Sequence, residues 1–400
     1  MHFIIIADDL TGAADTAARC FGGGLPAMVY PAFSQQPLMV GAAAFTSDSR
    51  HLPAAQAAQS VSRLIESIAA PANAIWYKKI DSTLRGNLGS ELDAMLATLT
   101  SRHDAARAAP CAVVCPAFPD QGRGLINGQL VLQTGGPQGI DLPTRLQEQT
   151  TRPHAAIPLS DVQRGAAPLA QCLQDVTQAG AQLLSIDALT NSDLEIIVTA
   201  AQQALPNALF CGSAGLAGAL TAHLLRQHPP ALSPPFMGEA RRTEAATLVV
   251  AGSGNPIAQQ QIQQLRGMSN LHTIEYQPQR IWALSPDLIL SNPTILLHLP
   301  PPAASAILDG PEARQHAAML GEQATILWQM LWPRRVILTG GDTAMAVLSR
   351  VGIEQLTIIE ELMPGIPLAL GHDRWGRTVE VILKPGGFGD AQTLVQLVQS

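Results

Sequence analysis

Short apolar runs and longer amphipathic windows alternate along most of the chain. In the first half the apolar runs predict strands at residues 3–7, 40–45, 75–80 and 112–115. The Ala-, Leu- and Gln-rich windows between them predict helices at residues 12–21, 54–68 and 88–99. Strands that alternate with helices in this way are typical of α/β domains with a largely parallel sheet.

The alternation is interrupted in two places. Residues 119–160 are rich in Gly, Pro and Gln without clear periodicity, which predicts hairpins or an excursion from the sheet. Residues 227–244 contain four prolines, a composition typical of a semi-rigid linker. Further strands are predicted at residues 182–186 and 208–211 before the linker, and at 247–251, 295–299, 336–338 and 378–383 after it.

The length of the chain predicts more than one domain. Its 400 residues exceed the roughly 250–300 residues that one hydrophobic core supports. We therefore expect an α/β protein of two α/β domains, at residues 1–228 and 246–400, joined by a Pro-rich linker at 229–245. Each domain should contain a largely parallel sheet, with a ligand cleft between the two.

Composition narrows the possible functions. Hydrophobic residues make up 47% of the chain and charged residues 14%, so the chain is expected to fold. The net charge is −7 and no long run of Lys and Arg occurs, which argues against a nucleic-acid partner. No apolar stretch is long enough to span a membrane and no signal peptide is recognisable, so we expect a cytoplasmic protein.

Lysine is rare and unevenly placed. Only three of the 24 basic side chains are lysines, at positions 78, 79 and 384, and all three lie in turn-like motifs. A chain that otherwise uses Arg, yet keeps compact ammonium groups in such turns, suggests that these groups serve ligand anions. The alternative is codon bias and chance.

Two acidic residues follow the first predicted strand, at the edge where α/β sheets bind ligands. Adjacent carboxylates such as Asp8 and Asp9 need hydroxyls, a metal or a basic partner. Asp8 could equally cap the helix predicted from Gly12, whereas ligand contact is favoured for Asp9. Arg50 follows the next strand and, taken alone, is as compatible with a solvated loop.

A denser cluster occupies residues 78–87, where three cations, a carboxylate, two hydroxyls and an amide meet at a strand-to-helix junction. Alternation sends Lys78 and Lys79 to opposite faces of the strand, so one should bind a ligand while the other pairs or packs. Arg85 has the bidentate fork that suits a carboxylate. The first domain is therefore expected to bind a small, polyhydroxylated anion.

Three Gly-rich turns follow strands in the second half, at residues 252–255, 340–343 and 385–390. Glycine lets backbone N–H groups approach phosphate oxygens, and a helix N-terminus adds a favourable dipole. Together the turns predict a nucleotide site, with ordinary tight turns as the alternative. The Walker A, His-Arg-Asp and Asp-Phe-Gly motifs are absent from the sequence.

These features belong to eight motifs that occur in the same order along almost the whole chain: IADDLTGA (6–13), SDSR (47–50), KKIDSTLRGN (78–87), PAFPDQGR (116–123), GSAGLA (212–217), AGSGNP (251–256), LTGGDTA (338–344) and KPGGFGD (384–390). In this combination the chain resembles the four-carbon acid sugar kinases. The resemblance implies a sugar-acid-binding N-terminal domain, a nucleotide-binding C-terminal domain, and phosphorylation of the 4-hydroxyl of a tetronate by ATP. The intact segment 78–85 favours D-threonate as substrate, with D-erythronate next.

The resemblance also implies site residues. The expected substrate contacts, which include Arg85 from its own chemistry, are Asp9, Arg50, Lys78, Lys79, Ile80, Asp81, Ser82 and Arg85. The expected nucleotide contacts are Ser253, Gly340, Gly341, Asp342, Thr343 and Gly387. Asp9 and Asp342 are the candidate bases for the accepting hydroxyl, and Mg²⁺ is expected on the ATP phosphates, with Asp342 and Asp390 as candidate ligands. A homodimer is the one further partner considered.

Two other classes fit part of the sequence. A haloacid-dehalogenase-like phosphatase begins with an apolar strand and Asp-x-Asp, but its second carboxylate would fall here at Leu10. A non-catalytic sugar-acid sensor would not need the Gly-rich turns of the second half. Consumption of ATP in the presence of a tetronate separates the three.

Overall fold

Two units make up the described chain, and each is considered by itself. The computed structural model describes residues 2–31, 41–102, 111–132, 136–227, 246–277, 284–291, 293–300 and 310–400. One unit comprises Met1–Ala27 and Gln35–Ser233, and the other comprises Met28–Ser34 and Pro234–Ser400. The linker expected at residues 229–245 lies outside the described residues.

The first unit is built on a parallel sheet with the strand order β3-β1-β4-β11-β5-β10-β9. Its strands are β1 (His2–Ala7), β3 (Gly41–Thr46), β4 (Ile75–Lys79), β5 (Ala112–Cys115), β9 (His154–Ile157), β10 (Leu183–Ile186) and β11 (Leu209–Gly212). Ile4, Ile5 and Ile6 of β1 are all fully buried. A parallel sheet covered on both faces produces such continuous apolar runs, which is why the sequence revealed most of these strands.

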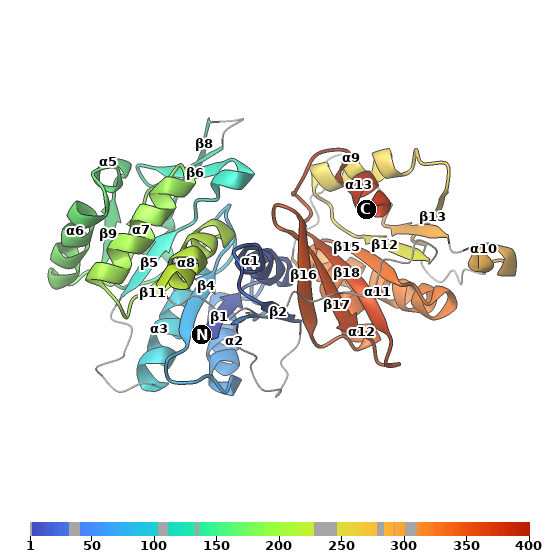
Figure 1. Cartoon of the computed structure of the whole chain (residues 1–400), viewed down its shortest axis with the longest axis horizontal. Helices are drawn as coiled ribbons and strands as arrows, with labels where there is room; N and C mark the ends of the chain where they lie inside the picture. The colour runs from blue at the N-terminus through green and yellow to red at the C-terminus, as the bar shows by residue number, and fades with distance from the viewer. Residues whose placement is uncertain are drawn as a thin grey trace. The chain divides into compact units, whose positions relative to one another are not determined.

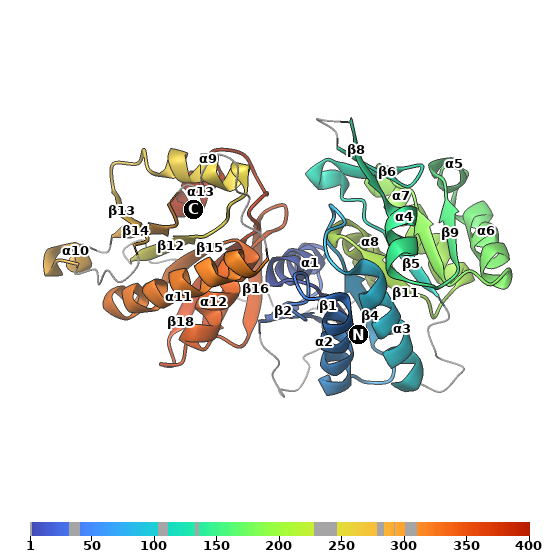
Figure 2. The same cartoon turned by 180° about the vertical axis from the view of Figure 1, so that it is seen from behind.

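Helices cover both faces of this sheet. One layer contains α1 (Leu10–Gly22), α6 (Ala166–Gln178), α7 (Asn191–Ala204) and α8 (Ala214–Gln227), which pack side by side (Figure 1). The opposite layer contains α2 (Ala54–Ser67), α3 (Leu88–Arg102) and α4 (Leu142–Gln149), seen from behind in Figure 2. A short helix, α5 (Leu159–Val162), contacts α6 and α7.

The excursion expected within residues 119–160 is confirmed. A separate antiparallel sheet has the order β6-β7-β8, with β6 at Arg123–Ile126, β7 at Gln129–Leu132 and β8 at Gly136–Asp141. A short 3₁₀ turn, η2 (Pro119–Gln121), precedes it. This small sheet matters for the site because β6 begins with Arg123, close to the polar end of β4.

The second unit has a mixed sheet with the order β13-β14-β12-β15-β18-β17-β16-β2. Its parallel part comprises β12 (Thr247–Ala251), β13 (Leu271–Glu275), β14 (Thr294–His298), β15 (Arg335–Thr339) and β18 (Thr378–Lys384). An antiparallel edge follows, formed by β17 (Ile366–His372), β16 (Leu356–Met363) and β2 (Ala27–Tyr30). Sequence patterning did not predict this edge.

Two pairs of helices pack together in the second unit. α9 (Pro256–Leu265) contacts α13 (Thr393–Gln399), and α11 (Pro311–Leu331) contacts α12 (Gly341–Val351). A further short helix, α10, spans Pro286–Leu290. None of the helices in the described part of the chain is long and apolar enough to cross a membrane.

Candidate functional site

The first polar site lies at the carboxyl end of β1, where α1 begins. Asp9 caps α1: its Oδ1 accepts the Gly12 N–H at 2.7 Å and its Oδ2 accepts the Thr11 hydroxyl at 2.8 Å. The helix therefore begins at Leu10, two residues earlier than predicted, and Asp9 rather than Asp8 is the capping residue. A side-chain oxygen in this position satisfies backbone donors that have no partner within the helix.

Arg50 resolves the repulsion between the two adjacent carboxylates. Its Nε and Nη2 donate to Asp8 at 2.8 and 2.9 Å, and its Nη1 donates to Asp9 Oδ2 at 2.7 Å. Burial alone would raise the pKa of Asp8, but the charges of Arg50, Lys78 and Lys79 hold that pKa below its ordinary value. The sequence allowed hydroxyls, a metal or a basic side chain as partners of Asp8 and Asp9, and the structure shows the basic side chain of Arg50.

The adjacent lysines of β4 point to opposite faces of the sheet, as the alternation predicts. Lys78 forms an ion pair with Glu91 of α3 at 2.7 Å, and its side chain is fully buried. Lys79 lies 3.8 Å from Asp15 of α1, and its Nζ donates to the Ile80 carbonyl at 3.0 Å. Both lysines therefore have a carboxylate neighbour, and Lys78 forms the shorter ion pair of the two.

Asp15 was not singled out in the sequence, because it lies within a helix rather than at a strand end. It is buried, and burial raises its pKa to about 6, although the charge of Lys79 acts in the opposite direction. Gly12 allows this arrangement: a Cβ at that position would lie 3.1 Å from Lys79 Nζ and 2.6 Å from Asp9 Oδ1. The start of α1 thus packs directly against the carboxyl end of β4.

The turn after β4 holds a second carboxylate and a second arginine. Asp81 accepts Arg85 Nε at 2.7 Å and Nη2 at 3.2 Å, and it also accepts the Thr83 hydroxyl. Burial would raise the pKa of Asp81, but Arg50 and Arg85 together hold it far below the ordinary value. Leu84 has φ +60°, a left-handed conformation that costs a non-glycine residue of order 1–3 kcal/mol and that is often found at functional sites.

Arg85 and Arg123 differ in exposure and origin. The side chain of Arg85 is 63% exposed, so it remains accessible while it pairs with Asp81. Arg123, from the small sheet, donates to the Ser82 hydroxyl. Burial lowers the pKa of Arg123, and the charges of Asp81 and Asp15 oppose that effect, so these groups form one cluster. Arg123 was not predicted as a site residue, although it ends the motif at 116–123.

The backbone of Ile80 is already engaged, because its N–H donates to the Gly212 carbonyl at 2.9 Å and its carbonyl accepts Lys79. Gly212 itself packs tightly: a Cβ there would collide with the Cys115 carbonyl. Gly212 thus allows β11 to pack closely against the neighbouring strand β5.

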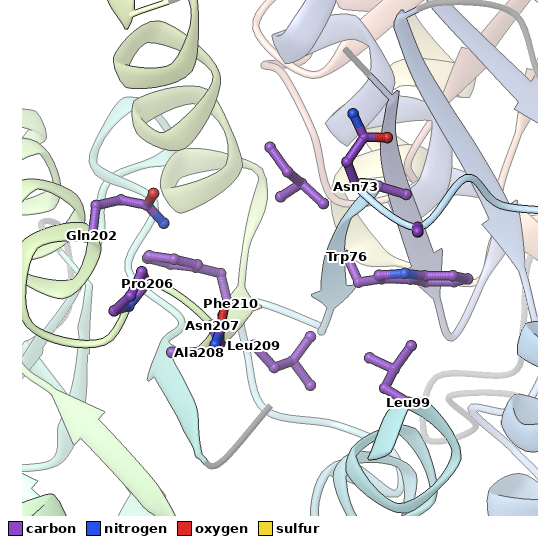
Figure 3. A pocket seen from close by; sticks show the side chains of 12 residues that line it. Asn73, Trp76, Leu99, Gln202, Pro206, Asn207, Ala208, Leu209 and Phe210 are labelled. Atoms are coloured by element: carbon purple, nitrogen blue, oxygen red, sulfur yellow. The ribbon is translucent and has the colours of Figure 1, made fainter. Parts of the chain in front are cut away.

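A separate pocket of about 290 Å³ lies at the opposite edge of the first unit's sheet, near the amino ends of β4 and β11 (Figure 3). Apolar side chains such as Trp76 and Phe210 line it together with the polar side chains of Asn73, Gln202 and Asn207 (Figure 3). Parallel α/β sheets bind their ligands at the carboxyl ends of the strands. This pocket is therefore distinct from the polar cluster.

In the second unit three Gly-rich turns come together at the carboxyl ends of β12, β15 and β18, which are adjacent parallel strands. A side chain at Gly386 would overlap the Ser253 hydroxyl, and one at Gly387 would lie 3.2 Å from Asn255 Nδ2. Gly340 has φ +98°, and a Cβ atom added to it would lie 3.4 Å from the Cβ of Ser253. Only residues without side chains permit this convergence.

The polar residues of these turns have different surroundings. Thr343 is buried, with its hydroxyl against Gly252, and Asp342 lies in the first turn of α12, which begins at Gly341. Asp390 Oδ1 accepts the Gln392 N–H at 2.9 Å and the Thr393 hydroxyl at 3.2 Å. The described residues contain no group of three or more His, Cys, Asp and Glu side chains that could hold a metal ion without further ligands.

Comparison with known proteins agrees with this division. The fold and the two sites are those of a two-domain α/β protein that has a cationic, carboxylate-rich site in one unit and a Gly-rich site in the other. Residues 3–220 match the family model of a sugar-binding N-terminal domain, and residues 303–394 match that of a nucleotide-binding C-terminal domain. The chain belongs to the four-carbon acid sugar kinase family, as its motifs predict.

Curated relatives cover nearly the whole chain. A D-threonate kinase from Bordetella bronchiseptica is 30% identical over 99% of this chain and 96% of its own length. A D-threonate kinase from Salmonella typhimurium is 29% identical over 98% of this chain and 97% of its own length. A 3-oxo-tetronate kinase from Burkholderia multivorans is 28% identical over 96% of this chain and 94% of its own length.

The fold is also found in a solved structure. A crystal structure from Salmonella typhimurium, described as a putative tRNA synthase, superposes with a TM-score of 0.75 at 22% identity and covers 99% of this chain and 98% of that chain. At this identity the likeness establishes the two-domain α/β fold, as predicted.

Proposed function

We propose that the protein uses ATP to phosphorylate the 4-hydroxyl of a four-carbon sugar acid, and that D-threonate is its preferred substrate. The observation that carries this proposal is the cluster at the carboxyl ends of β1, β3 and β4, where cations and carboxylates alternate around a turn. A polyhydroxylated anion needs both kinds of partner, cations for its carboxylate and acceptors for its hydroxyls. The D-threonate kinases among the relatives support the choice of substrate. D-erythronate is the alternative, since a D-erythronate kinase is also similar.

The substrate carboxylate is assigned to Arg85, with Ser82 and Arg123 beside it. Arg85 is accessible and its guanidinium has donors beyond the two that Asp81 accepts. Lys79 is the lysine that faces this cluster, because Lys78 is paired with Glu91. Arg50 acts indirectly, by holding the carboxylates that receive the sugar hydroxyls.

Asp9 is assigned to the accepting hydroxyl. Its two oxygens already accept Gly12, Thr11 and Arg50, which fixes the carboxylate in one orientation. Phosphoryl transfer depends mainly on alignment and charge neutralisation, so an oriented acceptor is more valuable than a strong base. Asp9 is therefore proposed to orient the hydroxyl, and Asp342 is the other candidate for proton acceptance.

The nucleotide is assigned to Ser253, to Gly340, Gly341, Asp342 and Thr343, and to Gly387. Mg²⁺, when bound, would neutralise charge on the ATP phosphates. It usually takes only one or two carboxylates besides water and phosphate, and Asp342 suits this role. Asp390 is less suited because its carboxylate accepts hydrogen bonds from the start of the C-terminal helix.

The test is an ADP-release assay with the full chain, ATP, Mg²⁺ and a panel of tetronates and tetrulosonates. D-threonate should give the highest kcat/KM, with phosphate found on the 4-oxygen by NMR. Absence of ADP formation with every sugar acid would overturn kinase activity on this substrate class, whereas a preference for D-erythronate would correct only the stereoisomer. Gly340→Ala in the second unit should reduce activity, and Gly376→Ala, a glycine with φ +77° outside the proposed site, is its matched control.

A further inference from the structure

Lys384 ends β18 and is the third lysine of the chain. Its side chain is fully buried, and its Nζ donates to the Pro385 carbonyl at 2.9 Å and to the Gly386 carbonyl at 3.4 Å. Lys79 ends β4 in the first unit and likewise donates to the carbonyl of the next residue, Ile80. The two lysines therefore have equivalent local geometry at the ends of parallel strands.

The three lysines differ in the carboxylate that compensates the charge of the ammonium group. Lys78 pairs with Glu91 and Lys79 lies 3.8 Å from Asp15. Across the ranges that the structure describes, Lys384 has no carboxylate partner, and burial lowers its pKa to about 7. A buried ammonium is costly unless an anion compensates it. Lys384 is therefore a position where an anionic ligand would be stabilised.

The last row of the sheet places other polar groups beside Lys384. His298 on β14, Ala251 on β12, Thr339 on β15 and Lys384 on β18 are in register across four adjacent strands, so their side chains share one face. Thr339 Oγ1 and His298 Nε2 are buried and have no hydrogen-bond partner among the described residues. Buried polar atoms are normally paired, so this row has donors and acceptors to offer a ligand.

Lys384 also adjoins the Gly-rich turns. The Gly340 N–H donates to the Lys384 carbonyl at 3.0 Å. Gly386 accepts Lys384 Nζ through its carbonyl, and its Cα adjoins the Ser253 hydroxyl. On the basis of the nucleotide site proposed above, we propose that the Lys384 ammonium neutralises phosphate oxygens of the bound nucleotide, with the Thr339 hydroxyl as a second donor.

A measurable consequence is proton uptake on nucleotide binding. A phosphate beside Lys384 favours the charged form and so raises the pKa of that lysine. At pH 8 a group with a pKa of about 7 is roughly one-tenth protonated, so a rise in that pKa on binding takes up at most ~0.9 proton per nucleotide. The terminal phosphate of ADP contributes little at this pH, because its pKa is near 6. Thr339, the neighbour on β15, does not titrate, and the other titratable member of the row is His298 on β14, three strands away from Lys384.

The experiment is calorimetry of ADP binding to the full chain at pH 8, in two buffers that differ in ionisation enthalpy. Wild type should take up protons on binding, at most ~0.9 per ADP. Lys384→Met, which keeps the length and removes the charge, should abolish the uptake and weaken ADP binding about 10- to 150-fold, the loss of one charge-assisted hydrogen bond. Arg164→Met is the control, because Arg164 is exposed and lies outside both proposed sites, and it should leave both quantities as in wild type. Adenosine, which lacks phosphate, should bind all three proteins equally.

The outcomes separate this inference from the proposed function. ADP binding by wild type without proton uptake, or unchanged ADP affinity in Lys384→Met, would overturn the role of Lys384 and leave the nucleotide site standing. An equal loss of adenosine and ADP affinity in Lys384→Met would show a structural role and also overturn it. Failure of wild type to bind ADP at all would overturn the nucleotide site itself. If Lys384→Met does not fold, proton uptake by wild type still decides the question.

Discussion

Replacing Arg50 by Met is the sharpest test of how the first unit's polar cluster is held together. Arg50 donates two hydrogen bonds to Asp8, whose side chain is 4% exposed, and one to Asp9. Without Arg50, Asp8 becomes a buried carboxylate without its ion-pair partner, which costs about 3–5 kcal/mol. Asp9 loses less, since its contacts with Gly12 and Thr11 remain. Arg50→Met should therefore destabilise the first unit by about 3–5 kcal/mol at pH 7.5.

Cysteine labelling can follow this unit alone. All five cysteines belong to the first unit, and four of them are buried: Cys20, Cys111, Cys115 and Cys211. The rate at which a thiol reagent labels them across a urea series therefore measures unfolding of the first unit. Arg164→Met is the control, because Arg164 is exposed and its ion pair with Asp161 should contribute no more than about 1 kcal/mol.

The pH dependence and a double variant give independent checks. In wild type the folded-state pKa of Asp8 is lowered, so its stabilising contribution is present above the unfolded pKa and is lost as pH falls through the folded pKa. In Arg50→Met burial should raise that pKa, so the sign reverses and the variant should be less destabilised at pH 5.5 than at pH 7.5. Adding Asp8→Asn should restore part of the loss. A cost below about 1 kcal/mol at pH 7.5, or the lack of any rescue by Asp8→Asn, would refute this account of Arg50.

Three other predictions follow from the two sites. Gly340→Ala should weaken ADP binding at least tenfold in calorimetry, because its positive φ costs an L-residue roughly 1–2 kcal/mol and the turn must shift; an equal loss in Gly376→Ala would contradict this. Arg85→Ala should raise the KM for the sugar acid about 10- to 150-fold in steady-state kinetics, with Arg164→Ala unchanged, and an unaltered KM would remove Arg85 from the carboxylate site. Asp15 has a folded-state pKa raised to about 6, so it contributes stability below the unfolded pKa that is lost as pH rises through 6. Between pH 4 and 7 the wild type should lose roughly 2 kcal/mol of unfolding free energy relative to Asp15→Asn in thermal unfolding. The same pH dependence in both proteins would contradict this prediction.

Much of the candidate site was visible in the sequence because its residues follow apolar strands. In a parallel sheet those positions meet at one edge whatever the rest of the chain does, so Asp9, Arg50 and the turn after β4 could be grouped without coordinates. The Gly-rich turns of the second unit could be grouped for the same reason. Asp15 and Arg123 could not, since one lies inside a helix and the other begins a strand of the small sheet.

The antiparallel edge of the second unit shows a similar limit. β16 alternates between buried and more exposed residues, because antiparallel strands can face solvent on one side, and its Glu360 and Glu361 weaken the apolar signal. β2 pairs with β16 although more than three hundred residues separate them in the sequence. Local pattern carries no information about such a partner.

Local sequence pattern was enough to locate the ends of many strands and the chemical groups that stand there, because burial on both faces of a sheet requires continuous apolar runs and tight turns require glycine. It also determined the family, through motifs spread over nearly the whole chain. Only the folded arrangement shows which carboxylate, if any, lies beside each basic side chain. The three lysines have the same chemistry and all lie at strand ends, yet Lys78 pairs with Glu91 and Lys79 lies beside Asp15. Among the described residues Lys384 has no carboxylate partner and donates to backbone carbonyls. An ammonium's role depends on which groups lie within a few ångströms of it, and those groups come from elements that only folding brings together.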